Sequence, residues 1–232
     1  MNTNKNEIND AGIRPSKTNN NQNRIVKKLS QLFAVRTAVP MSIAYCTLIS
    51  FIFAQTGSAQ AQAVNMPDAE TPKYTADGEL IPFSPDVYRE WIWVGEPLTP
   101  NSLNPPEANF PEFHDVYINP TAWREWKKSG TFPDGTVMIK ELTSVGFTNA
   151  PSGDGYFQGE FTGLEHAIKD SKRFPKEALG WGYFSFGHKY PLKEHAPLQQ
   201  FSTCAQCHVA NAKDNLMVFT EYYPVLRAAR GK

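Results

Sequence analysis

The stretch GTVMIKELTSV, residues 135–145, has a turn glycine followed by the alternating apolar and β-branched residues of a β-strand. Alternate residues of a strand share a face, so Lys140 lies between Met138 and Leu142 on a face that looks buried. A buried ammonium is costly unless it is paired, deprotonated or used chemically. The rest of the chain has to show which of these applies to Lys140.

Four other runs rich in aromatic and β-branched residues are bounded by turn signals. They predict strands at 90–95, 113–118, 156–162 and 181–186. The loop at 149–155 predicts a turn that joins two strands as a hairpin. We therefore expect one α+β domain with a predominantly antiparallel β-sheet and a few short helices.

Helix signals are weaker. Thr162 and Glu165 match a T-x-x-E capping box, which predicts a helix from Gly163 to about residue 173. An N-cap asparagine, a following proline and a closing glycine predict a helix within 119–130. Two more helices are expected, after Cys204 and over 224–230.

Residues 1–63 have the pattern of a secretory signal. A basic segment precedes the charge-free run AVPMSIAYCTLISFIFA at 38–54, and the small-residue stretch AQAQA follows at 59–63. We expect cleavage after Ala61 or Ala63 and a periplasmic protein, with an uncleaved membrane anchor as the alternative. Residues 64–86, rich in proline and acid, are expected to form an extended lead-in to a domain at 87–232.

Signal removal changes the charge balance. The chain has 23 basic and 23 acidic residues, of which seven basic and two acidic lie in 1–63. The mature part then has 16 basic and 21 acidic residues, a formal net charge of −5. This mildly acidic composition gives no reason to expect binding to nucleic acid or to an anionic membrane.

The cysteines carry the strongest motif. Cys204 and Cys207 are the two that remain after signal cleavage, and with His208 they form the C-x-x-C-H pattern of covalent c-type haem attachment. Two thiols at this spacing can each bond a haem vinyl group while His208 presents its imidazole to the iron. A zinc site would need a fourth ligand, and a thioredoxin-like pair would need a βαβ context that is missing here.

A second axial ligand is not evident. Met66 lies in the expected lead-in, Met138 lies on the 135–145 strand, and Met217 follows His208 by only nine residues. The sixth coordination position of the iron is therefore predicted to be open. An open position favours small-molecule chemistry over pure electron transfer.

With these motifs in place, a family resemblance emerges. The runs CAQCHVANAKDNLMVFTEYYPVLRAA (204–229), GYFQGEFTGLEHAIKDSKRFP (155–175), FPDGTVMIKELTSVG (132–146) and EWIWVGEPLTPNSLN (90–104) resemble cytochrome P-460. The resemblance implies a β-sheet domain with one c-type haem and a homodimer. It also implies oxidation of hydroxylamine to nitrous oxide, nitric oxide or nitrite.

The resemblance also assigns residues. In that family a lysine nitrogen is cross-linked to a meso carbon of the porphyrin, which here implies Lys140, and a snorkelling edge lysine is the alternative. Glu165 is implied as a distal carboxylate that accepts protons and has a raised pKa, and a helix-capping role is its alternative. Phe110 matches an aromatic over the distal face and could equally be a core residue. His114 stands where a basic or polar pocket residue is expected.

The remaining candidates have weaker roles. His188 and His195 are expected to be solvated, with a sixth-ligand role as the alternative, and Phe219 is expected to pack against the haem or the core. Expected partners are hydroxylamine and nitric oxide, a soluble c-type cytochrome as electron acceptor, and a second copy of the chain.

Two rival protein classes remain to be weighed. The first is a non-enzymatic nitric-oxide-binding or electron-transfer protein of the cytochrome c′-beta type, which shares the sheet but lacks the cross-link. A helical cytochrome c′ also carries a C-terminal C-x-x-C-H. It would need four long helices, which the short strands and 18 prolines disfavour.

Overall fold

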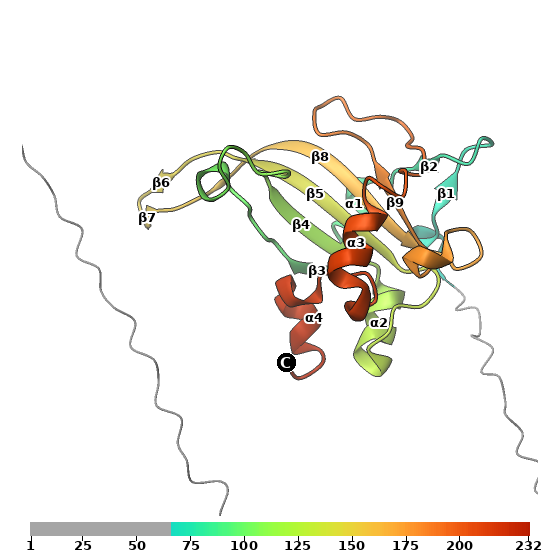
Figure 1. Cartoon of the computed structure of the whole chain (residues 1–232). Coiled ribbons are helices and arrows are strands. Elements are labelled where there is room, and N and C mark those ends of the chain that lie inside the picture. Colours follow the sequence, from blue (N-terminus) through green and yellow to red (C-terminus); the bar gives the residue numbers. More distant parts are fainter. Residues whose placement is uncertain (1–65) are drawn as a thin grey trace, which may run out of the picture. The chain divides into compact units, whose positions relative to one another are not determined.

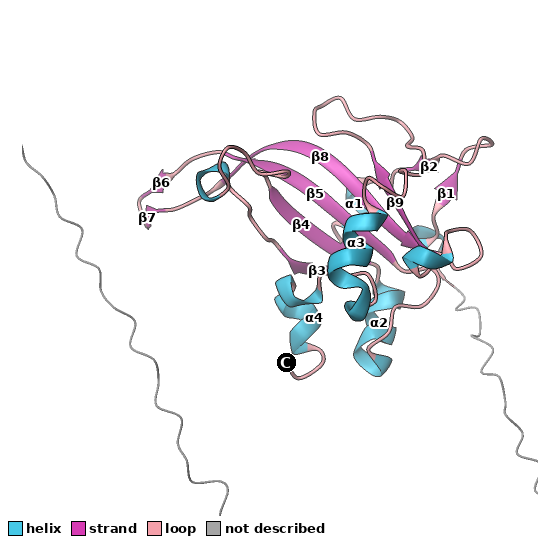
Figure 2. Cartoon of the chain, in the orientation of Figure 1, coloured by secondary structure: helices cyan, strands magenta, loops and turns pink. Residues whose placement is uncertain are grey.

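The computed structural model describes residues 66–232, and their main feature is a five-stranded antiparallel sheet (Figure 1). The strand order is β3 (Ile92–Gly95), β4 (Phe113–Ile118), β5 (Val137–Val145), β8 (Gln158–Lys169) and β9 (Trp181–Ser185). Helices are few and short (Figure 2), so the predicted α+β fold with an antiparallel sheet is confirmed. The signal segment predicted at 1–63 lies outside the described residues.

Two small hairpins and four α-helices accompany the sheet in the described part of the chain. The hairpins pair β1 (Lys73–Tyr74) with β2 (Leu80–Ile81), and β6 (Asn149–Ala150) with β7 (Gly153–Asp154). The helices are α1 (Pro85–Tyr88), α2 (Pro120–Ser129), α3 (Ala205–Ala212) and α4 (Pro224–Ala228). Single 3-10 turns lie at Asp68–Glu70, Asn101–Leu103, Lys176–Ala178, Lys213–Asn215 and Thr220–Tyr222. Across 66–232 no helix combines the length and the apolar character needed to cross a membrane.

The helix predicted from Gly163 is wrong. Residues 163–169 continue strand β8, which pairs with β5 on one side and with β9 on the other. Leu164, His166 and Ile168 share one face at the strand period of two, and all three are buried. Pairing on both edges satisfies the backbone of this segment, so the T-x-x-E pattern has no helix start to cap.

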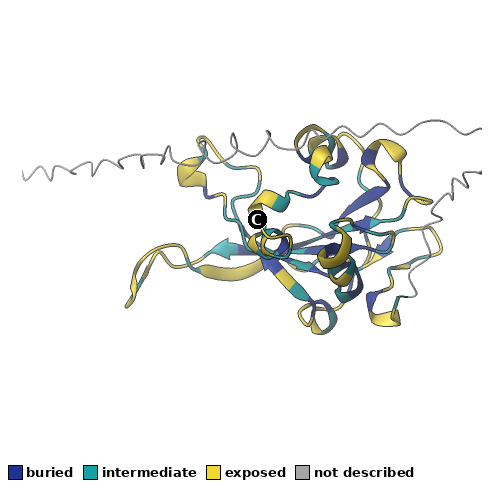
Figure 3. Cartoon of the chain, turned by 90° about the horizontal axis from the view of Figure 1, so that it is seen from below, coloured by how far each residue is buried: buried dark blue, intermediate teal, exposed yellow. Residues whose placement is uncertain are grey.

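The two faces of the sheet are covered by different parts of the chain. Helices α2, α3 and α4 lie on one face, called here the helix-covered face (Figure 1). Its core combines strand residues with helix residues and includes Val116, Ile118, Met138, Trp181, Tyr183, Trp126, Ala205 and Leu226. The opposite face packs against the N-terminal segment, with Leu80, Phe83, Tyr88 and Trp91 among its buried residues. Burial is concentrated along the sheet, and the β6–β7 arm is exposed (Figure 3).

The expected lead-in is folded over its described part, 66–86. The β1–β2 hairpin lies beside residue 196, because Leu80 and Ala196 exchange two backbone hydrogen bonds, of 2.8 and 2.9 Å. Leu80 is fully buried and Phe83 nearly so. The backbone N–H of Phe83 also donates to Nε2 of the buried His166. Proline and acidic residues at this density did not prevent packing, because the few apolar residues between them fill the opposite face.

The side chain of Glu70 caps the N-terminus of helix α2. Asn119 occupies the N-cap position, as predicted, but its side chain does not cap the helix. Instead, Asn119 Oδ1 accepts from the Val137 N–H at 2.9 Å, and Asn119 Nδ2 donates to Glu70 Oε2 at 2.9 Å. Glu70 Oε2 also accepts from the Thr121 N–H at 2.8 Å. A buried carboxylate from the N-terminal segment therefore supplies the cap and the negative charge that a helix N-terminus favours.

Replacing Glu70 with alanine is expected to lower the free energy of unfolding by about 2 kcal/mol, because it leaves buried donors without an acceptor. Urea unfolding followed by circular dichroism measures this change. Asp68→Ala is the matched control, because Asp68 lies in the same 3-10 turn but its side chain is 85% exposed. Equal midpoints for the Glu70 variant and the wild type would contradict the capping role.

Candidate functional site

Helix α3 carries the C-x-x-C-H motif on the helix-covered face of the sheet. Cys204 is the N-cap of this helix, and Cys207 and His208 lie within its first turns. Both cysteines are free thiols, Cys204 partly buried and Cys207 exposed. Burial, followed by the negative charge of Glu165, raises the pKa of the Cys204 thiol.

The His208 ring is held in one orientation. Its Nδ1 lies 2.7 Å from the carbonyl oxygen of Met217, whose backbone is left-handed at φ 71°. The rings of Tyr183 and Phe219 flank the imidazole, with centroids 4.4 and 4.9 Å away. Burial lowers the pKa of His208, which favours the neutral imidazole. A ring that donates through Nδ1 leaves Nε2 as the available metal ligand.

Strands β5 and β8 place Lys140 and Glu165 opposite each other on the helix-covered face. The two residues are direct cross-strand partners, and Lys140 Nζ lies 2.5 Å from Glu165 Oε2. Both side chains are largely enclosed, 23% and 18% exposed. The lysine of the 135–145 strand is thus paired with a carboxylate in this structure, which offsets the cost of its burial.

Three aromatic or imidazole rings surround this ion pair. Phe110 has its ring centroid 4.1 Å from Lys140 Nζ, a cation–π contact. The same ring lies 5.9 Å from the ring of His114 and 5.6 Å from that of His188. The structure therefore brings the predicted Lys140, Glu165, Phe110 and His114 together, although their roles remain predictions.

The electrostatics of Glu165 differ from the expectation. Burial alone would raise the pKa of its carboxyl group, but the hydrogen bond from His188 and the charge of Lys140 outweigh burial and lower it to about 2. The raised pKa predicted from the sequence is that of a carboxyl group beside haem, and it stays a prediction. It considered burial beside apolar groups and did not include the hydrogen bond from His188 or the charge of Lys140.

His114 is the least satisfied side chain of the cluster. Burial, followed by the charge of Lys140, lowers its pKa to about 4, so the ring is neutral at ordinary pH. Its Nε2 is buried and has no hydrogen-bond partner among the described residues. A neutral imidazole with a free nitrogen can donate to or accept from a small ligand in this space.

The donor set fits a covalently attached haem. Two free thiols, one oriented imidazole with an available Nε2, and a buried Tyr183 hydroxyl without a partner in the described structure lie together on the helix-covered face. Within 66–232, no group of three or more His, Cys, Asp or Glu side chains is arranged to hold a bare metal ion. The described residues therefore offer no cluster of ligands that would support the alternative of a zinc site.

Two residues of the cluster were not foreseen from the sequence. His188 is exposed, as expected, but its Nε2 also lies 3.0 Å from Glu165 Oε1. Glu112 has Oε1 3.7 Å from His188 Nδ1. Both lie in loops whose positions depend on tertiary structure, so no local pattern marks them. His195 lies apart from this cluster and pairs with Glu79.

Comparison with known proteins agrees with this geometry. A search of curated proteins found no match. The family model described as Cytochrome P460 matches residues 85–220, more than half of the chain. That range contains the Lys140–Glu165 pair and the C-x-x-C-H motif. The chain therefore belongs to the cytochrome P460 family and is a haem-binding cytochrome of the c type.

Proposed function

We propose that this protein oxidises hydroxylamine at a c-type haem bonded to Cys204 and Cys207, ligated by His208 and cross-linked to Lys140. The observation that carries the proposal is the Lys140–Glu165 pair, which lies on the same face of the sheet as helix α3. An amine and a carboxylate beside the haem motif offer a nucleophile and a proton acceptor.

Each residue has a defined task in this proposal. The thiols of Cys204 and Cys207 anchor the cofactor, and the Met217 carbonyl orients His208. When bound, the haem iron supplies an open site for hydroxylamine and takes up its electrons. The Lys140 nitrogen would hold the macrocycle to strand β5, and a bond there would let the protein tune the haem by distorting it.

Glu165 accepts protons from the substrate. Hydroxylamine loses protons as it loses electrons, so a carboxylate at hydrogen-bonding distance lowers the barrier. A bond from Lys140 to the porphyrin removes the free ammonium that helps to lower the pKa of Glu165. The pKa of Glu165 then rises toward the range in which a carboxylate both accepts and releases protons.

The cellular setting of the proposal follows from the resemblance and the N-terminal pattern. The protein acts in the periplasm as a homodimer and passes electrons to a soluble c-type cytochrome. Nitrous oxide, nitric oxide and nitrite are the products expected of the reaction. Nitric oxide is also expected as a ligand of the iron.

A turnover assay on the purified haem protein tests this function. Hydroxylamine with an artificial electron acceptor is expected to give acceptor reduction together with nitrous oxide, nitric oxide or nitrite, measured by absorbance and gas chromatography. Boiled protein and an ordinary c-type cytochrome serve as controls. A protein that binds nitric oxide but never reduces the acceptor would contradict the enzyme assignment.

A second candidate is a nitric-oxide-binding protein of the cytochrome c′-beta type, in which Lys140 would keep its ion pair with Glu165 and form no bond to the porphyrin. The intact mass and the optical spectrum separate the two candidates, because only a cross-linked protein departs from the ordinary c-type spectrum.

A further inference from the structure

A third group continues the Lys140–Glu165 pair toward the surface. His188 lies in the loop after β9, and its ring is 38% exposed. Its Nε2 is 3.0 Å from Glu165 Oε1, and its Nδ1 is 3.7 Å from Glu112 Oε1. The second distance exceeds a hydrogen bond, and a small rotation of the ring would close it. The two nitrogens of one imidazole therefore face two carboxylates.

A glycine allows this loop to approach the sheet. A Cβ at Gly163 would lie 2.6 Å from the Gly187 carbonyl oxygen and 3.1 Å from the Cα of His188. The same loop is tied to β8 by hydrogen bonds between Leu164 and residues 186–187. The missing side chain at 163 lets the backbone carry His188 to within reach of Glu165, two residues along the strand.

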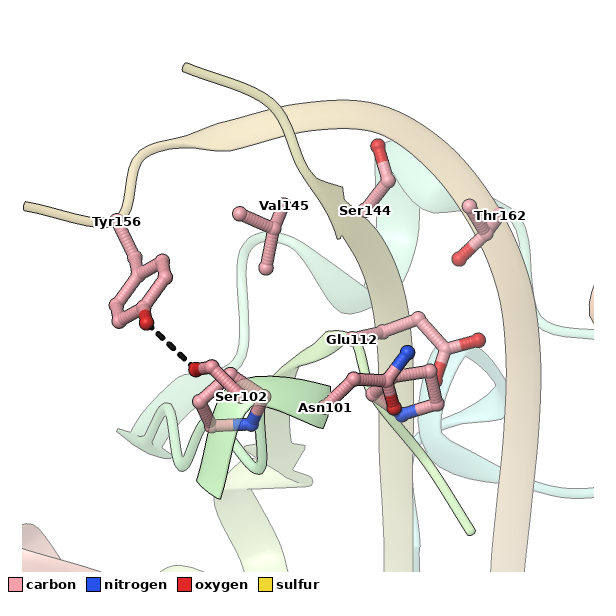
Figure 4. A pocket seen from close by; sticks show the side chains of 9 residues that line it. Asn101, Ser102, Glu112, Ser144, Val145, Tyr156 and Thr162 are labelled. Atoms are coloured by element: carbon pink, nitrogen blue, oxygen red, sulfur yellow. Dashed lines mark hydrogen bonds between the residues drawn. The ribbon is translucent and has the colours of Figure 1, made fainter. Parts of the chain in front are cut away.

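Glu112 opens into a pocket of about 450 Å³. The pocket lies between the 100–112 loop, the end of β5 and the start of β8, and Figure 4 shows Glu112 beside Asn101. A hydrogen bond of 2.8 Å between Ser102 and Tyr156 closes its far side. Glu112 Oε2 and Thr162 Oγ1 are buried and have no partner among the described residues. Unpartnered polar atoms in a space of this size are suited to binding water.

Charges on every neighbouring element act on His188. Glu165 on β8, Glu112 before β4 and Lys140 on β5 face it, as does His114 on β4. On its own loop, Lys189, Lys193 and Glu194 are exposed. The hydrogen bond with Glu165 is the largest cause of a raised His188 pKa, which burial partly opposes. A ring between two carboxylates can be charged or neutral, as a proton carrier must be.

We propose that His188 and Glu112 form the path by which protons leave Glu165 for the water of this pocket. The proposal rests on the proposed function, because it needs protons delivered to Glu165 by substrate oxidation. It gives the structure a route from an enclosed carboxylate to solvent that bypasses the C-x-x-C-H helix.

Each transfer moves one proton and no electrons. The step starts from neutral His188 with its proton on Nδ1 and a free Nε2, the tautomer that matches a protonated Glu165. Protonated Glu165 gives its proton to Nε2, and the proton on Nδ1 passes to Glu112. Glu112 then releases it to the pocket. The ring then again donates from Nε2 to ionised Glu165. The ring ends as the other tautomer, and a proton exchange with water at Nδ1 and Nε2 restores the first form. The electrons leave separately through the haem to the external acceptor.

Conservative variants test the path in the haem protein. His188→Gln and Glu112→Gln are each expected to lower hydroxylamine turnover roughly tenfold, while haem content and hydroxylamine binding stay unchanged. The matched controls are His195→Gln, which changes the other histidine of the same region, and Glu107→Gln, an exposed glutamate of the 100–112 loop. Both controls are expected to turn over at the wild-type rate.

The pH profile separates proton transfer from a structural role. The hydrogen bond from His188 is the largest of the causes that lower the pKa of Glu165. Without this hydrogen bond the pKa of Glu165 rises, so the carboxylate is protonated at higher pH. The acid limb of the pH–rate profile is therefore expected to shift to higher pH in His188→Gln. Glu112 is not among the groups that shift the pKa of Glu165. Glu112→Gln is therefore expected to slow turnover without moving the acid limb of the pH–rate profile. Added imidazole is expected to restore turnover to His188→Ala, because it enters the vacated space.

The outcomes are distinct. Loss of turnover with the two pH signatures and imidazole rescue supports the path. If the wild-type protein is active and both variants keep its rate and its pH profile, the path is overturned and the proposed function stands. A wild-type protein without hydroxylamine turnover overturns the proposed function, and the path with it.

Discussion

Glu165→Gln is expected to lower the rate of hydroxylamine turnover by about 10²–10⁴-fold while the protein keeps its haem. Glutamine preserves the shape of the side chain and its place between Lys140 and His188. It removes the carboxylate that is proposed to accept the substrate's protons. Steady-state assays with an excess of acceptor measure the change, and a spectral titration shows whether hydroxylamine still binds.

Glu160→Gln is the control for this variant. Glu160 lies on the same strand and is exposed, so its replacement changes charge without touching the cluster. The wild-type rate is expected for the control. A Glu165→Gln protein with undiminished turnover would refute the role of Glu165 as proton acceptor, whatever its stability.

Lys140→Met is expected to leave the haem attached through both cysteines and to abolish the proposed cross-link. The optical spectrum should become that of an ordinary c-type cytochrome, and hydroxylamine turnover should fall by at least about 10²-fold, since each lost tenfold corresponds to 1.4 kcal/mol of barrier. Proteolysis and mass spectrometry of the haem peptides report directly whether residue 140 is bonded to the porphyrin.

Two further variants separate the bond from the charge. Lys140→Arg keeps a cation opposite Glu165 but supplies a guanidinium that does not act as a nucleophile. It is therefore expected to behave as Lys140→Met does. Lys169→Met changes a lysine of the neighbouring strand β8 with a similar exposure, 19% against 23% for Lys140, and should keep the modified spectrum. A wild-type spectrum identical to that of Lys140→Met would contradict the cross-link.

Local sequence signals predicted the strands and helices that have a clear hydrophobic pattern or clear capping residues. Strands at 113–118 and 137–145, the helix closed by Gly130 and the helix after Cys204 all correspond to the structure. The second half of β8 was missed, because Thr162 and Glu165 matched a helix start. Pairing with β5 and β9 decides that segment, and pairing is not visible in a local pattern.

The candidate site likewise contains residues that were predicted and residues that only the tertiary structure brings in. Lys140, Glu165, Phe110 and His114 were all named from the sequence, and the structure brings them together. His188 was set aside as a solvated histidine, because nothing local indicates that the loop after β9 folds back over Gly163. The low pKa of Glu165 was missed for a related reason, since it depends on a hydrogen bond from that loop.

The register irregularities between β5 and β8 affect where the chain can tolerate changes in length. Pairing is regular from Val137 to Leu142, where it holds Lys140 opposite Glu165, and shifts between Leu142 and Thr143 and again before Val145. The β6–β7 arm begins beyond these shifts. Insertions and deletions in the arm can be absorbed there by a further bulge. Changes in the length and composition of the exposed arm can therefore leave the spacing of Lys140 and Glu165 unaltered.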